Sequence, residues 1–235
     1  MDDSAKWERY GALGGILFVV LIIASIAVSG SNPKSSDSAA KILKSFQDNK
    51  DGIKVSAFLG ALAALPILWW AGSLWARMRR AEGGQPRLAL IAVLALVFAG
   101  ASQAGSSAIS ATVALVLKDV GAAQAKFFFV LSMGLGAASS VGIATLVLAV
   151  SVLALRTRVF PVWLGWVGVV DAILFLVGSY SIATTSDALG GVGFAAFIVW
   201  AIWIIVVSVI MFRGKEAAAP MTPEQVRVPV DTVNN

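Results

Sequence analysis

Six long stretches of apolar residues, separated by short polar segments, organise this chain. They cover about residues 11–28, 55–76, 88–117, 127–155, 161–183 and 192–212. A helix that crosses the hydrocarbon core of a bilayer needs about 20 consecutive apolar residues. The pattern therefore predicts an all-α fold: a polytopic membrane helix bundle with six transmembrane helices.

The polar segments around these stretches predict the rest of the organisation. Residues 1–10 carry mixed charges and form a polar N-terminal segment, residues 11–215 form the membrane domain, and residues 216–235 are expected to be a disordered tail. In the long loop after the first span, Ala39, Ile42, Leu43 and Phe46 recur at helical spacing, and Asp37 precedes them as a candidate N-cap. A short amphipathic helix is predicted there. It lies either on the membrane surface or over the mouth of the bundle.

Two features inside the spans predict how the helices bend and pack. Pro66 lies within the second span, where a proline removes one backbone hydrogen bond and tends to kink a helix. Gly134, Ala138 and Gly142 recur every four residues in the fourth span. Small residues at that spacing let two membrane helices approach closely, so they predict a packed face.

Composition supports the membrane assignment and narrows the chemistry. Charged residues make up 13% of the chain, against about 25% in a typical soluble domain, so lipid must cover much of its surface. The chain has no Cys and no His, which excludes thiol nucleophiles, zinc sites built on Cys and His, and a Ser-His-Asp triad. Paired carboxylates are missing from the spans. We therefore predict no catalytic residue, no metal site and no cofactor, and an enzyme is the less favoured class.

The basic residues are distributed unevenly between the two sides of the predicted bundle. Six spans place both termini on one side, together with eleven Lys and Arg residues that include every Arg; the other side carries seven Lys. Cytoplasmic loops carry the excess of Lys and Arg. Both termini are thus predicted to be cytoplasmic. The net charge of +5 indicates an anionic leaflet as partner, not nucleic acid.

Asp171 is the only charged residue in the fifth span, and it defines the candidate site. A carboxylate at a helix centre costs about 2.5–3.5 kcal/mol on insertion scales, so it should face the bundle interior or a wet cavity. A protonated carboxyl would donate to polar groups of the third span, and indole N–H groups of the sixth span would donate back. The candidate ligand-binding residues are Asp171, Gln103, Ser106, Ser110, Trp200 and Trp203.

Two interpretations of Asp171 remain open at this point. In the first, it is a proton-linked or cation-binding carboxyl in a cavity among spans three, five and six. In the second, it makes structural hydrogen bonds between helices. Its helix face contains Gly168 and Gly178, which favours a packed contact over exposure to lipid.

Two segments at the ends of spans resemble those of a known group of proteins. One comprises FQDNKDGIKVSAFLG (residues 46–60) followed by LWWAGSLWARMRR (residues 68–80), and the other is LRTRVFPVWLGWVG (residues 155–168). They resemble a family of uncharacterised six-helix integral membrane proteins common in actinobacteria. The resemblance runs from the first outer loop to the fifth span. It implies the six-span topology and a bacterial inner membrane, and it supplies no activity and no functional residue.

These observations lead to two hypotheses about function. The first is a membrane protein without catalytic machinery, acting as an accessory or stabilising subunit of a membrane complex. The alternative is a carrier or binder of a small apolar or cationic molecule in a cavity around Asp171. The expected partners are the lipid bilayer and either another membrane protein or further copies of the same chain.

Overall fold

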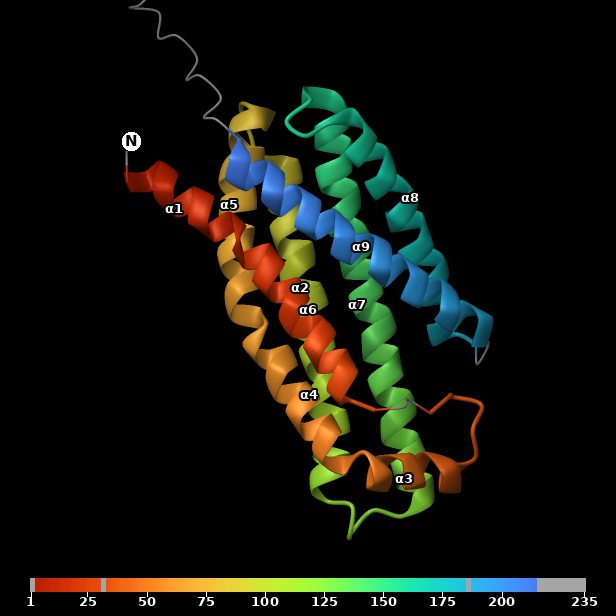
Figure 1. Ribbon diagram of the computed structural model, residues 1–235. Coiled ribbons are helices and arrows are strands. Elements are labelled where there is room, and N and C mark those ends of the chain that lie inside the picture. The colour runs from red at the N-terminus through yellow and green to blue at the C-terminus, as the bar shows by residue number, and fades with distance from the viewer. Residues whose placement is uncertain (1–2, 31–32, 185–186, 215–235) are drawn as a thin grey trace, which may run out of the picture.

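The structure, a computed structural model, describes residues 3–30, 33–184 and 187–214, and every regular element in these ranges is a helix (Figure 1). In chain order they are α1 (Asp3–Ala12), α2 (Gly14–Val28), α3 (Ala39–Asp48), α4 (Lys50–Leu62), α5 (Ala64–Glu82), α6 (Arg87–Leu115), α7 (Ala122–Thr157), α8 (Val162–Ser179), the short 3-10 helix η1 (Tyr180–Ile182) and α9 (Asp187–Arg213).

The predicted bundle of six apolar helices is confirmed. Six segments are long and apolar enough to cross a membrane: Trp7–Val28, Lys50–Glu82, Arg87–Leu115, Ala122–Thr157, Val162–Ser179 and Gly191–Arg213. Most are helical beyond the predicted apolar stretch, since a helix continues through polar first and last turns that a hydropathy pattern does not count. Helix α7 has 36 residues, which corresponds to about 54 Å and exceeds the thickness of the hydrocarbon core.

The two ends of the chain differ in how far they follow the prediction. The predicted polar N-terminal segment is helical from Asp3, since it forms α1, which leads into α2 after an interruption at Leu13. The predicted disordered tail, residues 216–235, lies outside the described residues.

The second span is interrupted where its proline was expected to disturb the helix. It consists of α4 and α5, which are separated at Ala63, one turn before Pro66.

Charged and aromatic side chains fasten the end of the bundle at which α1 begins. Both terminal nitrogens of Arg80 contact the carboxylate of Glu8, at 2.6 and 2.5 Å, and this ion pair joins α5 to α1. The guanidinium of Arg77 lies over the ring of Phe160, 5.1 Å from its centre, and donates to the carbonyl of Val159 at 3.2 Å. Arg77 thereby connects α5 to the turn between α7 and α8.

Helix α3 crosses the opposite end of the bundle (Figure 1). Its apolar residues Ile42 and Phe46 are buried, and they form a small cluster with Val113 of α6 and Ala125 of α7. This cluster is separate from the main core. Of the two predicted placements, α3 therefore covers the mouth of the bundle.

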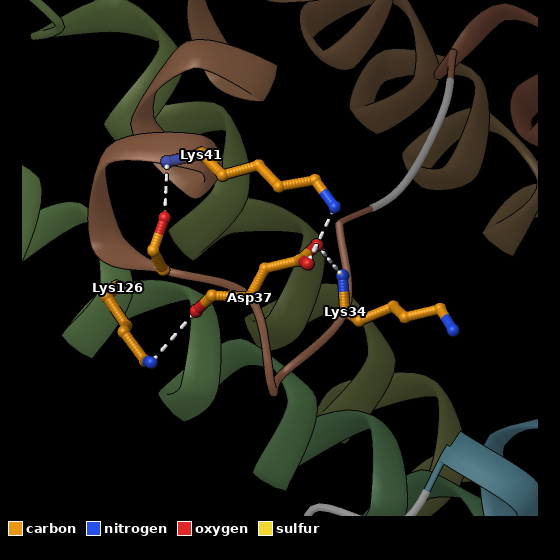
Figure 2. Close-up of polar contacts among 5 residues, drawn as sticks. Lys34, Asp37, Lys41 and Lys126 are labelled. Carbon is orange, nitrogen blue, oxygen red and sulfur yellow. Dashed lines mark hydrogen bonds and ion pairs between the residues drawn. The ribbon is translucent and has the colours of Figure 1, made fainter.

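Polar contacts around Asp37 fix the start of α3 (Figure 2). The N-cap is Ser38, whose hydroxyl accepts from the backbone N–H of Lys41, and not Asp37 as predicted. The carboxylate of Asp37 instead accepts from the Lys41 ammonium at 2.7 Å and from the backbone N–H of Lys34 at 2.9 Å. These two contacts, the Lys41 ammonium first, lower the pKa of Asp37 below its ordinary value. Lys126 of α7 donates to the backbone carbonyl of Asp37 at 2.9 Å, which ties the loop to the bundle.

The packing of α6 against α7 depends on small residues. A Cβ added at Gly142 would lie 2.8 Å from Cβ of Ala99 and 3.0 Å from the carbonyl oxygen of Ala95. One turn away, the hydroxyl of Ser139 donates to the carbonyl of Ala99 at 2.9 Å. By contrast, a Cβ at Gly134 would meet no atom within 4 Å. Only one end of the predicted small-residue series is therefore used in this contact.

Replacement of Gly142 by Ala should destabilise the protein, whereas the same change at Gly134 should not. The added methyl at Gly142 meets backbone atoms of α6 that cannot move independently, and such overpacking typically costs about 1–3 kcal/mol. The measurement is the free energy of unfolding of both variants in detergent, followed by circular dichroism. Equal effects at the two positions would contradict the proposed close approach of α6 and α7.

Candidate functional site

Asp171 lies in the interior of the bundle, on the face of α8 that packs against α7 and α9. Its side chain is 0% exposed, and neither carboxylate oxygen has a hydrogen-bond partner among the described residues. Glycines bring α8 into this position. A Cβ at Gly168 would touch the hydroxyl of Ser151 in α7, and one at Gly178 would lie 3.0 Å from Cα of Gly193 in α9. The prediction that Asp171 faces the interior is confirmed.

The two tryptophans of the predicted site lie in α9, opposite α8. The indole nitrogen of Trp203 donates to the carbonyl of Leu164 at 3.2 Å. The ring of Trp200 meets Phe175 edge-to-face with 6.3 Å between ring centres, and its buried indole nitrogen has no partner among the described residues. Since Leu164 and Phe175 flank Asp171 along α8, the contacts of the two tryptophans lie on either side of the carboxyl.

The third-span residues of the predicted site lie elsewhere. Helix α7 separates α6 from α8, and the hydroxyl of Ser106 donates to the carbonyl of Ser132 in α7 at 2.7 Å. On α7, Ser132 is 19 residues from Ser151, which faces α8; that separation corresponds to about 28 Å along a helix. Within the described residues, spans three, five and six thus do not enclose the predicted cavity. The hydroxyl of Ser106 makes a bond between helices instead.

The other two residues of the third-span stripe also lie apart from Asp171. Gln103 is exposed, and Ser110 lines a small cavity at the α3 end of the bundle. The prediction paired polar residues by chemical complementarity. Which helices lie side by side is set instead by the short turns before and after α7, because they make α6, α7 and α8 successive neighbours and leave α6 away from Asp171.

The interior around Asp171 is filled by side chains. The cavity that Ser110 lines measures about 50 Å³, and a second hollow, beside Ser151 and Trp203, has no room for a water molecule. Asp171 lines neither of them. Sites for drug-sized ligands measure about 300–1,000 Å³.

Three buried polar groups near the core were not predicted. The hydroxyls of Ser151 and Ser208 and the indole nitrogen of Trp70 are buried without a partner in the described part of the chain. A Cβ at Gly15 would lie 2.7 Å from the indole nitrogen of Trp70 and would touch the hydroxyl of Ser208, so α2, α5 and α9 meet at this glycine. In the sequence, the adjacent glycines at positions 14 and 15 were the feature that could have predicted this close approach of helices.

The chemistry open to this arrangement is limited. Within residues 3–30, 33–184 and 187–214, no three His, Cys, Asp or Glu side chains are grouped to hold a metal ion. Among the described residues, neither oxygen of Asp171 has an ionic or hydrogen-bond partner with which to relay a proton. A single buried carboxyl can bind one proton or accept hydrogen bonds.

The fold and the site define the class: this is a multi-pass α-helical membrane protein, and Asp171 is enclosed between its helices. No protein-family model, curated protein or solved structure matches the chain.

Replacement of Asp171 by Leu should stabilise the fold. Leu has the same branching as Asp but is larger, because methyl groups replace the two oxygens. An unpaired buried polar group costs about 1–3 kcal/mol, and crowding by the larger side chain offsets part of the gain from removing it. We therefore expect the free energy of unfolding to rise by less than that amount. Asp171→Asn should leave it nearly unchanged, since the amide would also be unpaired.

Trp203→Phe serves as the control, because it removes an observed hydrogen bond and should cost about 0.5–1.5 kcal/mol. The three variants are compared by unfolding in detergent. A clear loss of stability in Asp171→Asn, which has the same size and shape, would mean that the carboxyl has a hydrogen-bond partner in the folded protein.

Proposed function

We propose that this protein is an accessory or stabilising subunit of a membrane complex, and that it acts by packing its helices against a partner. The observation that carries the proposal is a stripe of small residues on the outer surface of α6. Gly100, Ala104 and Ala108 follow one another every four residues and are exposed, and a Cβ at Gly100 would meet no atom within 4 Å. A membrane helix of another chain would cover them.

The physical reason lies in how helices associate in lipid. Apolar side chains gain little from leaving lipid for a helix interface, so close approach at small residues supplies much of the attraction. The same device already works within this protein, where Gly142 of α7 lies against Ala99 of α6. On another face of α6, Gly100, Ala104 and Ala108 are exposed, and no atom of the described residues lies within 4 Å of a Cβ built at Gly100. The closed interior around Asp171 also favours a structural role over a catalytic one.

The test is native mass spectrometry of the protein extracted mildly from its own membrane. We expect a stoichiometric complex with a second membrane protein, and the double variant Gly100→Leu/Ala104→Leu should lose it. Val97→Leu changes an exposed residue on the same side of α6 and should retain the complex. Solitary monomers of the wild type would contradict the proposal.

A carrier or binder of a small apolar or cationic molecule is the second candidate. It is favoured by one observation: both carboxylate oxygens of Asp171 and the indole nitrogen of Trp200 are buried without partners among the described residues. Binding would require the helices around Asp171 to separate. In the same mass spectra, a small molecule bound to a lone chain would support this candidate, provided that Asp171→Asn abolishes the adduct.

We further propose that the protein resides in a bacterial inner membrane with both termini in the cytoplasm. The excess of basic residues supports this orientation: Arg79, Arg156 and Arg213 lie at the ends of α5, α7 and α9, at the end of the bundle where α1 begins. The resemblance to the actinobacterial family supports the choice of membrane.

Single cysteines test the orientation cleanly, because the natural chain has none. Ser36→Cys places a thiol in the exposed loop before α3, and Gln85→Cys places one in the exposed turn between α5 and α6. A membrane-impermeant maleimide should label only Ser36→Cys in intact cells and both variants after lysis. Labelling of Gln85→Cys in intact cells would reverse the assignment.

A further inference from the structure

A small cavity lies beneath α3, at the end of the bundle opposite the N-terminus. It measures about 50 Å³ and is bounded by α3, α4, α6, α7 and the loop before α3. Three serines line it, Ser29, Ser45 and Ser110, together with the apolar residues Phe46, Ile53 and Phe129. It lies far from Asp171. It is separate from the main core and from the exposed small residues Gly100, Ala104 and Ala108 of α6 that the proposed function invokes.

The lining combines free hydrogen-bonding capacity with apolar walls. The hydroxyl of Ser29 is engaged, since it donates to the carbonyl of Ile26 at 2.8 Å. The hydroxyl of Ser110 has no hydrogen-bond partner among the described residues. Phe46 and Phe129 meet edge-to-face, with 6.4 Å between their ring centres, and form a rigid apolar wall. All of the lining side chains are uncharged, so an ionic group would find no counter-charge.

The volume limits what can enter. An apolar cavity of about 150 Å³ holds a benzene molecule, which has six non-hydrogen atoms. By that scale, a cavity of about 50 Å³ accommodates about two non-hydrogen atoms. A hydroxymethyl group has one carbon and one oxygen. Its oxygen would bond to the hydroxyl of Ser110, and its carbon would lie against the phenyl wall.

The position of the cavity indicates where the rest of such a molecule lies. Ser110 is five residues before the end of α6, which is about 7.5 Å along the helix, so the cavity lies near the end of this span. Helix α3 covers it with Ser45 and Phe46, and the bond from Lys126 to the carbonyl of Asp37 fixes the loop before α3 against α7 (Figure 2). A molecule at this depth comes either from the lipid leaflet or from the aqueous side.

We infer that the cavity beneath α3 binds the terminal hydroxymethyl group of an uncharged alcohol. A neutral lipid such as a monoacylglycerol and free glycerol both carry this group. The two sources share the same chemistry in the cavity and differ in whether an acyl chain remains in the membrane.

The test is a binding titration of the full-length protein in detergent, followed by native mass spectrometry. The probes are 1-monooleoylglycerol, free glycerol and methyl oleate, which has the same acyl chain without the hydroxymethyl group. Monooleoylglycerol or glycerol should bind at one site, and methyl oleate should not. Binding of monooleoylglycerol alone identifies a lipid source, and binding of glycerol alone identifies a soluble one.

Variants of Ser110 locate the site. Ser110→Ala removes one hydrogen bond and should weaken binding about two- to tenfold. Ser110→Leu fills the cavity and should abolish binding. Ser107→Ala, a change on the same helix at a residue that does not line the cavity, should bind like the wild type.

Thermal unfolding without probe checks that each variant is folded. If Ser110→Leu does not fold, Ser110→Ala still tests the inference. Three results would overturn the inference: equal binding of monooleoylglycerol and methyl oleate, wild-type binding by Ser110→Ala, or binding of none of the probes, which would leave only water in the cavity.

Discussion

In a bilayer, two helices gain little by burying apolar side chains against each other, because lipid is equally apolar. Close packing and hydrogen bonds between helices are what remain, and residues without bulk allow the closest packing. Helix α7 has such residues on two sides. Gly142 and Ser139 receive α6, and Ser151 lies against Gly168 of α8. The order of α6, α7 and α8, the burial of Asp171 and the exclusion of Gln103 from the interior all depend on this central helix.

The bundle is not packed equally along its length. At the end where α1 begins, the large side chains of Trp70, Trp203 and Phe160 are almost fully buried and fill the space between helices. Toward the other end, α4 contains no buried residue. Helix α3 compensates by inserting Ile42 and Phe46 between the ends of α6 and α7, and the cavity beneath α3 is the space that these two side chains do not fill. Tight and loose packing thus coexist in one bundle. At the loosely packed end, the contacts of Asp37 hold the start of α3 and the loop before it in place.

Hydropathy was sufficient to predict the six spans, the burial of Asp171 and the existence of α3, because each follows from the transfer of one residue or one segment between water and lipid. The neighbours of a helix do not follow from such transfer. The pairing of Asp171 with Ser106 failed for this reason, since both residues face protein but different faces of α7. The N-cap of α3 differed by one position because Asp37 and Ser38 are both good caps, and the carboxylate of Asp37 instead accepts from the Lys41 ammonium and the backbone N–H of Lys34.

The meeting of α2, α5 and α9 at Gly15 bears on how the protein is made. Translation delivers α2 and α5 to the membrane well before α9 leaves the ribosome, so the indole of Trp70 at first lacks the neighbour that Ser208 later provides beside Gly15. Until α9 is synthesised, the core around Gly15 and Trp70 therefore lacks one of the three helices that meet there.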